Sequence, residues 1–408
     1  METLFTHAAV WLFLAVISAV LANHLKVSIA LMEICMGVAA AAIITHFWGA
    51  NSFPNNEEWL KFLASSGAVL LTFLAGAELE PEVMKTKLKE VSIVGFVGFL
   101  APFVGCALIA HYGLGWDLQA SLLAGIALST TSMAVVYAVM LETGFNRTEF
   151  GKGVLGACFV NDLGTVLALG LIFAPFTYRT FVFIGGCLVA FFLLPYATSF
   201  LTRHYGHRTA AIRTKWIVFV LFALGALALW SGSEAVLPAY IAGMVLAEFT
   251  SDDAHFMRRL RTLTVGFLTP FYFLRAGSLV ALPALIAAPA VFIVFLAAKT
   301  VSKIFGLLPV VSAFRTEKNE RWYYTLMMST GLTFGTISAL YGFNHGIVTQ
   351  SQYSFLVATV IASAVIPTLI ANAAFMPRHL LPETATVSVE PAGRGALPPK
   401  EEEDVGEE

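Results

Sequence analysis

Apolar runs of about 20 residues recur along most of the chain, and they limit its possible folds more than any other feature. A helix of that length crosses the roughly 30 Å hydrocarbon core of a bilayer. None of the runs alternates apolar and polar residues, as the wall of a membrane β-barrel must. Only 12% of the residues are charged and the mean hydropathy is +0.79, which excludes a soluble domain. The sequence therefore predicts an all-α, polytopic membrane protein.

Counting the apolar runs predicts about 13 transmembrane helices. They cover approximately residues 5–22, 27–47, 60–79, 90–112, 118–141, 151–174, 178–201, 214–230, 234–249, 262–282, 285–309, 322–341 and 352–376. The loops after the odd-numbered spans, with the start of the tail, carry 17 of the 24 Lys and Arg residues, whereas the opposite loops carry only Lys61 and Arg179. Basic loops remain in the cytoplasm, so we expect an external N-terminus and a cytoplasmic C-terminus in the plasma membrane or cell inner membrane.

The chain divides into a transmembrane domain over residues 1–379 and an acidic tail over residues 380–408. The tail is rich in Pro, Glu and Thr, a composition typical of disorder. The first apolar run lacks the basic start and the cleavage motif of a signal peptide. The four cysteines lie inside the predicted spans without the spacing of a metal site, so we interpret them as apolar packing residues.

Two adjacent polar residues, Asn161 and Asp162, interrupt the apolar run at 153–173, and Asp162 is its only ionisable residue. A carboxylate at that depth costs several kcal/mol unless it faces a bundle interior, a water-filled cavity or a counter-ion. Asp162 could merely bond a neighbouring helix, or it could lie on an ion or proton path. The remaining intramembrane polar residues favour the path.

Predicted spans 5 and 12 both contain a polar interruption. Span 5 holds four consecutive hydroxyl residues at 129–132, and span 12 holds Ser329, Thr330 and Gly331. Isolated hydroxyls often bond a carbonyl one turn earlier, but a matched pair of polar runs favours two discontinuous helices. Transporters with inverted repeats have such helices around an ion site at the midplane. We therefore expect two inverted six-helix repeats, spans 1–6 and 8–13, with crossed discontinuous helices at spans 5 and 12.

The predicted ion site combines the central carboxylate with the oxygen atoms of the first interruption. Oxygen ligands suit a hard monovalent cation, which would bind Asp162, Thr130 and Thr131, with Asn161 and Ser132 beside them. A bare carboxylate is unstable in the membrane core, so Asp162 should hold either the cation or a proton. Competition between the two ions for one carboxylate is sufficient for exchange. No nucleophile–base pair indicates an enzyme, and no cofactor or nucleic acid is expected.

Four further charged residues are candidates for a supporting role. Lys299 and Lys303 are four residues apart, hence on one helix face, although Lys303 could also extend to the cytoplasmic surface. Arg275 lies near the middle of predicted span 10 and needs a partner. Glu78, near the cytoplasmic end of span 3, could pair locally or line the ion path.

Five short motifs occur in an order that points to a known family. They are LTFLAGAELEP (71–81), ALSTTSMAV (127–135), GACFVNDLGTVLALG (156–170), LPAYIAGMVLAE (237–248) and KIFG (303–306). Over about residues 10–378 the chain resembles the bacterial and archaeal monovalent cation:proton antiporters of the sodium/hydrogen exchanger superfamily. Within that superfamily it is similar to the second antiporter family, which includes the Kef-type membrane domain.

This resemblance implies that Asp162 binds the cation or the proton beside Thr130 and Thr131, and that Lys303 is the functional lysine. It also implies a homodimer in which a core domain moves like an elevator against a dimerisation domain. Many electrogenic members have an aspartate where this chain has Asn161, which indicates electroneutral exchange of one cation for one proton. Arg275 stands where an apolar residue is expected and could replace part of the missing charge network.

The sequence as a whole predicts secondary active exchange of Na⁺ for H⁺, with K⁺ or Li⁺ as other compatible cations and pH homeostasis as the role. Two alternatives remain open. One is a potassium-efflux antiporter that works with a separate regulatory subunit, and the other is a membrane sensor that does not transport.

Overall fold

The computed structural model describes residues 2–25, 27–48, 55, 57–77, 81–145, 148–173, 177–205, 211–251 and 254–381. Every regular element within these residues is helical, which confirms the predicted all-α class. The predicted tail falls almost entirely on residues 382–408, outside the described residues, and Glu78 also lies outside them.

The first half of the chain forms eight α-helices, and α4 continues directly into the π-helical turn η1. Their bounds are α1 (Glu2–Leu25), α2 (Ile29–Trp48), α3 (Glu58–Ala77), α4 (Pro81–Leu108), η1 (Ile109–Gly113), α5 (Leu118–Ser129), α6 (Met133–Thr143), α7 (Glu149–Phe173) and α8 (Tyr178–Tyr205).

The second half contains more short helices. Their bounds are α9 (Ile212–Ser231), α10 (Val236–Val245), α11 (Ala247–Ser251), α12 (Ala254–Leu263), η3 (Thr264–Leu268), α13 (Thr269–Ser278), α14 (Leu282–Ala287), α15 (Pro289–Phe314), α16 (Lys318–Met327), α17 (Thr333–Asn344), α18 (Gln350–Ala374) and the 3₁₀ turn η4 (Arg378–Leu380).

Nine helices of the described chain are long and apolar enough to cross a membrane, namely α1, α2, α3, α4, α7, α8, α9, α15 and α18. The other four predicted spans overlap chains of shorter helices: α5–α6, α10–α11, α12–η3–α13 and α16–α17. Each predicted span therefore coincides with a helical segment. The number of crossings and the inverted repeats remain predictions.

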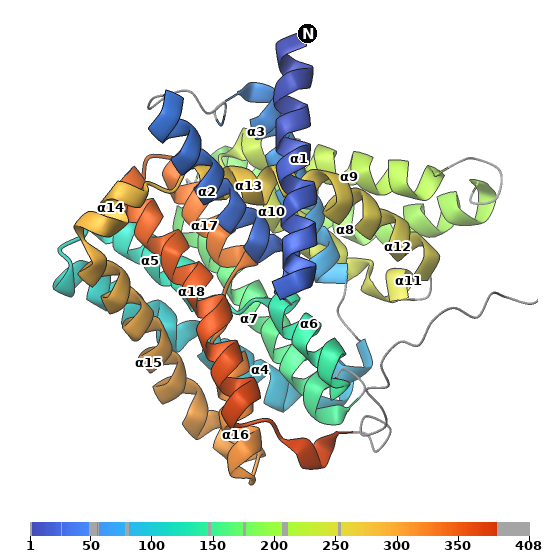
Figure 1. Cartoon of the computed structure of the whole chain (residues 1–408). Helices are drawn as coiled ribbons and strands as arrows, with labels where there is room; N and C mark the ends of the chain where they lie inside the picture. The colour runs from blue at the N-terminus through green and yellow to red at the C-terminus, as the bar shows by residue number, and fades with distance from the viewer. Residues whose placement is uncertain are drawn as a thin grey trace, which may run out of the picture.

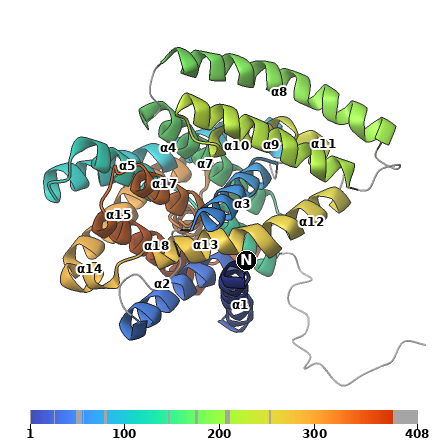
Figure 2. The same cartoon turned by 90° about the horizontal axis from the view of Figure 1, so that it is seen from above.

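The helices pack as two groups (Figures 1 and 2). In the first group, α10 packs on α3 and α9, α13 packs on α2 and α3, and α8 packs on α9. In the second group, α4 packs on α5, α7 and α15, while α18 packs on α15, α16 and α17. Helix α10 also packs on α7, which joins the two groups.

Close contact between helix backbones fixes α10 against α3. A Cβ atom on Gly76 of α3 would collide with the carbonyl oxygen of Tyr240, and one on Gly243 of α10 would collide with that of Phe73. Small residues let membrane helices approach in this way. The contact holds Tyr240 of α10 at the boundary between the two groups, where its ring packs on Phe159 of α7.

Candidate functional site

Two breaks in helices lie against each other in the second group. Helix α5 ends at Ser129, the backbone of Thr130 is extended, and α6 begins at Met133. Helix α16 ends at Met327 and α17 begins at Thr333. The backbone N–H of Ser132 donates to the carbonyl of Thr330 at 3.2 Å, so the breaks touch. Both fall at the predicted polar runs, and we call residues 129–132 and 328–332 the crossing.

Asn161 of α7 bonds both sides of the first break. The N–H of Thr131 donates to Asn161 Oδ1 at 2.9 Å, and Asn161 Nδ2 donates to the carbonyl of Ser129 at 3.4 Å. Helix ends leave N–H and C=O groups without intrahelical partners, and a side-chain amide can satisfy one of each. A carboxylate could only accept, so the amide at this position matches what the break requires.

Asp162, the next residue of α7, is 1% exposed. Its Oδ1 atom has no hydrogen-bond partner in the described part of the protein. A buried, unbonded carboxylate oxygen is costly unless a proton or a cation neutralises it. Asp162 directly follows Asn161, so this unsatisfied carboxylate oxygen belongs to the residue next to the one that bonds the first break.

Both intramembrane lysines of α15 reach the first break. Lys303 Nζ donates to Thr131 Oγ1 at 2.9 Å, and Lys299 Nζ donates to the carbonyl of Thr130 at 3.2 Å. Both lysines are fully buried, so Lys303 does not extend to the surface. Among the ion pairs of the described residues, none within 4.0 Å joins either lysine to Asp162. The two positive charges therefore bond the crossing itself.

The hydroxyls of the first break are already engaged. Thr131 Oγ1 donates to the carbonyl of Met328 at 2.8 Å while it accepts from Lys303. Thr130 Oγ1 donates to the carbonyl of Ala127 at 3.2 Å, and Ser132 Oγ accepts from the N–H of Val135 at 3.4 Å. The structure thus brings together Asn161, the hydroxyl residues and both lysines. No hydrogen bond between described residues joins Asp162 to either threonine.

Gly331 and Tyr240 belong to this region but were not among the predicted site residues. A Cβ atom on Gly331 would collide with Lys299 Nζ, so the glycine leaves space for that ammonium group. Tyr240 donates its hydroxyl to the carbonyl of Phe159 at 3.0 Å, and its ring meets Phe334 of α17 edge-on. Its place in the motif at 237–248 was the available signal.

Arg275 does not join the crossing. It lies in the last turn of α13 rather than in the middle of a span, and its Nε donates to the carbonyl of Asn55 at 3.0 Å. Its side chain lines a cavity of about 230 Å³ whose lining includes neither Asp162 nor Lys303. The idea that Arg275 replaces part of the charge network at Asp162 therefore loses its geometric basis.

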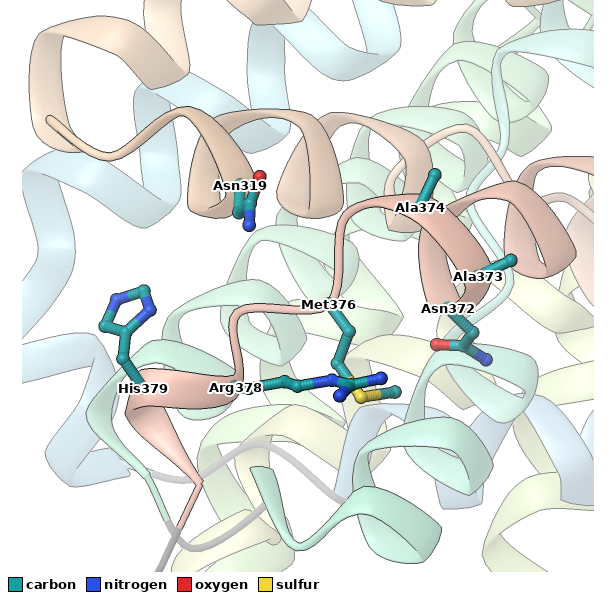
Figure 3. A pocket seen from close by; sticks show the side chains of 7 residues that line it. All are labelled: Asn319, Asn372, Ala373, Ala374, Met376, Arg378 and His379. Carbon is teal, nitrogen blue, oxygen red and sulfur yellow. The ribbon is translucent and has the colours of Figure 1, made fainter.

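A second cavity, of about 340 Å³, lies where the end of α18 meets the start of α16 (Figure 3). It is lined by Asn319, Asn372, Ala373, Ala374, Met376, Arg378 and His379. His379 Nε2 lies 2.8 Å from Glu320 Oε1, and Tyr323 donates its hydroxyl to Asn372 Oδ1 at 3.1 Å. None of its lining residues belongs to the crossing, so we do not assign it to the candidate site.

Comparison with known proteins identifies a matching protein family. A family model described as "Sodium/hydrogen exchanger, transmembrane" matches residues 10–375. Among curated relatives, a "Probable Na(+)/H(+) antiporter 3" of Methanocaldococcus jannaschii is 29% identical over 252 residues, 59% of this chain and 63% of that protein. The "Na(+)/H(+) antiporter NhaS4" of Synechocystis sp. is 24% identical over 369 residues, 84% of this chain and 88% of that one.

Two of these relatives are longer than the region that this chain matches. The match spans 46% of a "Putative Na(+)/H(+) antiporter YjbQ" of Bacillus subtilis, at 26% identity, so the chain spans less than two thirds of this relative and of the first one named above. A solved structure, the sodium proton antiporter MjNhaP1 of Methanocaldococcus jannaschii at pH 8, superposes with a TM-score of 0.68 at 16% identity. It covers 92% of this chain and 98% of its own, which shows a common fold.

Proposed function

Because the chain belongs to the sodium/hydrogen exchanger transmembrane family, we propose that it exchanges a monovalent cation for H⁺ across the membrane. Na⁺ is the favoured cation, since the relatives named above are Na⁺/H⁺ antiporters, and K⁺ and Li⁺ remain compatible. The observation that carries the proposal is the buried Oδ1 atom of Asp162, which lacks a hydrogen-bond partner among the described residues. Asp162 directly follows Asn161, which bonds the first of two touching helix breaks.

In this proposal Asp162 is the shared binding site for the cation and the proton. A hard cation needs several oxygen ligands. Thr130 and Thr131 are the proposed co-ligands, and a carbonyl oxygen of either break can accept the ion through its second lone pair. The ion replaces the proton on Asp162, and the proton replaces the ion, so the carboxylate is never left bare in the membrane.

The proposed stoichiometry is one cation for one proton. Asp162 is the single carboxylate of the predicted span at 151–174, and the residue before it is Asn161 rather than a second aspartate. One positive charge crosses with Asp162 in each direction, whether it is Na⁺ or H⁺, and no net charge moves in a cycle. Lys299 and Lys303 keep their contacts with the first break throughout. In this scheme neither lysine transfers a proton across the membrane.

For the conformational step we propose an elevator-type movement of the second helix group against the first. The division of the packing into two groups, joined through α7 and α10, supports it. The crossing belongs wholly to the second group, so the binding site would move as one unit. The first group would then form the stationary part and the contact between the two subunits of a homodimer.

The test uses the purified full-length protein in proteoliposomes with a pH dye inside. Addition of Na⁺, Li⁺ or K⁺ outside should alkalinise the lumen, with the largest rate for Na⁺, while empty vesicles give no signal. A response to K⁺ alone would favour the potassium-efflux alternative, and no response to any cation would favour the sensor. On a solid-supported membrane a cation jump should give no sustained transport current, and such a current would refute electroneutrality.

A further inference from the structure

The cavity beside Arg275 lies between the two helix groups. Helices α3, α10 and α13 of the first group and α17 of the second form its walls. It measures about 230 Å³, which is room for an ion and more than one water molecule. The polar members of its lining are Ser65, Glu234, Tyr272, Arg275, Tyr341, Asn344 and His345.

Two hydrogen-bond donors in this lining lack acceptors. The hydroxyl of Tyr272 is buried and has no hydrogen-bond partner among the residues that the structure describes, and the whole residue is 3% exposed. Arg275 is 4% exposed, and its hydrogen bond to Asn55 uses Nε alone. A guanidinium group carries five N–H donors, so the N–H groups of both Nη atoms are left for the cavity. A buried hydroxyl such as that of Tyr272 is costly without a partner, and the Nη groups of Arg275 border the space of the cavity.

The charges of the cavity also point to a missing acceptor. Its one carboxylate, Glu234, lies 3.9 Å from His345 Nε2. No ion pair within the described residues includes Arg275. The carbonyl end of α13 offsets part of the guanidinium charge, because a cation in the last turn interacts favourably with the helix dipole. A buried guanidinium still needs an anionic partner for full compensation.

We infer that this cavity binds a small monovalent anion of the size of chloride between the guanidinium of Arg275 and the hydroxyl of Tyr272. Charge-assisted hydrogen bonds from guanidinium groups are the strong ones in proteins. The carboxylate of Glu234 in the same cavity disfavours a multiply charged anion such as phosphate. A bound anion neutralises the positive charge that a cation would meet when it approaches the boundary between the two helix groups from this face.

The experiment measures binding and needs no exchange activity, so its result is independent of the proposed function. The unfolding temperature of the full-length protein is recorded in sodium chloride and in sodium gluconate at equal Na⁺ concentration and ionic strength. Gluconate is too large for the donor pair. We expect the unfolding temperature to be at least about 2 °C higher in chloride.

The variant Tyr272→Phe keeps the shape of the side chain and removes one donor, and it should lose at least half of the chloride shift. Arg275→Gln should lose all of it. Tyr196→Phe removes the same hydroxyl from an exposed position on α8 and should keep the full shift. Broadening of the ³⁵Cl NMR line by the wild type, reduced in Tyr272→Phe, is a second readout that does not depend on thermal unfolding.

Three outcomes would overturn the inference. The first is an equal unfolding temperature in the two salts for the wild type. The second is an undiminished chloride shift in both cavity variants, which would assign the effect to another part of the surface. The third is a chloride shift that appears only in Glu234→Gln, because Glu234 would then be the counter-ion of Arg275 and the native cavity would bind no anion.

Discussion

The crossing and the cavity beside Arg275 are both buried and polar, but they lack partners of opposite kinds. At the crossing, hydrogen bonds from Asn161, Lys299 and Lys303 engage the first break, and the atom left over is an acceptor, Asp162 Oδ1. In the cavity the buried atom without a partner among the described residues is the hydroxyl of Tyr272, and Arg275 adds N–H groups that its bond to Asn55 does not use. The kind of unsatisfied atom therefore indicates the charge of the missing ligand, a cation at the first site and an anion at the second.

The two regions also differ in how firmly their polar groups are held. The crossing is bonded to α7 and α15, and its two breaks bond each other. The cavity is formed mainly by the ends of helices, and its carboxylate, Glu234, comes from the connection between α9 and α10. We expect a preformed and selective site at the crossing, and a partly hydrated site with modest affinity in the cavity.

The largest expected effect comes from Asp162→Asn. The amide can neither ionise nor carry a proton, so exchange should fall to the rate of empty vesicles. The chloride shift in unfolding temperature should persist, because the cavity lies apart from the crossing. Retained cation-driven alkalinisation in this variant would remove Asp162 from the mechanism, and a simultaneous loss of the chloride shift would show that the two regions are not independent.

Asn161→Asp should change the net charge of the crossing, because it adds a second carboxylate. The new carboxylate still accepts from the N–H of Thr131, which is the residue that also accepts from Lys303. It can therefore pair with that lysine and release an extra proton when the cation binds. Transient-current recordings should then give a sustained transport current that the wild type lacks. Asn161→Leu, which removes both hydrogen bonds to the break, should unfold at lower temperature and give no current.

Gly331→Ala should disturb the crossing without removing any of its polar groups. The added Cβ collides with Lys299 Nζ and displaces it from the carbonyl of Thr130. The loss of this charged hydrogen bond costs about 1.5–3 kcal/mol of folding stability, and the displaced ammonium should slow exchange by about tenfold. Gly185→Ala on α8, where a Cβ atom meets nothing within 4 Å, is the matched control. Shortening the lysine in the double variant Gly331→Ala with Lys299→Ala should recover part of the folding stability if the collision is the cause.

Thr130→Val should weaken apparent cation affinity by about fivefold while the maximal rate changes less, because it removes one neutral ligand and leaves the carrier. The measurement is the cation dependence of alkalinisation in proteoliposomes. Thr359→Val is the control, because it deletes an equally buried hydroxyl whose hydrogen bond among the described residues goes to a carbonyl of its own helix. An unchanged KM in Thr130→Val would exclude Thr130 as a ligand.

The smallest expected effect concerns the pH dependence of the cavity. Burial raises the pKa of Glu234 above its ordinary value, and His345 opposes part of that shift. The other charged or titratable lining groups are Arg275, Tyr272 and Tyr341. Glu234 therefore takes up a proton at a higher pH than an exposed carboxylate, and acidification should increase the chloride shift by about 1 °C. In Glu234→Gln this increase should shrink, and an equal increase would exclude Glu234 as its source.

Much of the fold follows from local features of the sequence. The apolar runs predicted the positions of the helical segments, and the hydroxyl and glycine runs predicted both breaks, because a run of polar residues at membrane depth has few other uses. The sequence did not predict where short helices and π-helical turns occur. The segments α10–α11 and α12–η3–α13 read as continuous spans, since hydropathy does not register a π-helical turn or a short helix.

The sequence predicted the types of residue in the candidate site better than the contacts between them. Asn161 was predicted beside the ion site and as the position of a missing carboxylate, whereas its bonds to Ser129 and Thr131 depend on the break and α7 lying side by side. Arg275 was misjudged because the end of α13 at Ser278 is not visible in the apolar pattern. Its bond to Asn55 joins residues 220 positions apart, which no local pattern encodes.

The contact between Gly76 and Gly243 has a consequence for how sequences of this kind can vary. Side chains at most helix contacts can be exchanged for others of similar volume, and pairs of changes compensate each other. Here the neighbours are backbone atoms, which no second substitution can shrink. A library of all single variants should accept only glycine at both positions, and no partner mutation should rescue the loss. Mutational drift should therefore leave glycine at both positions while the apolar residues around them are replaced.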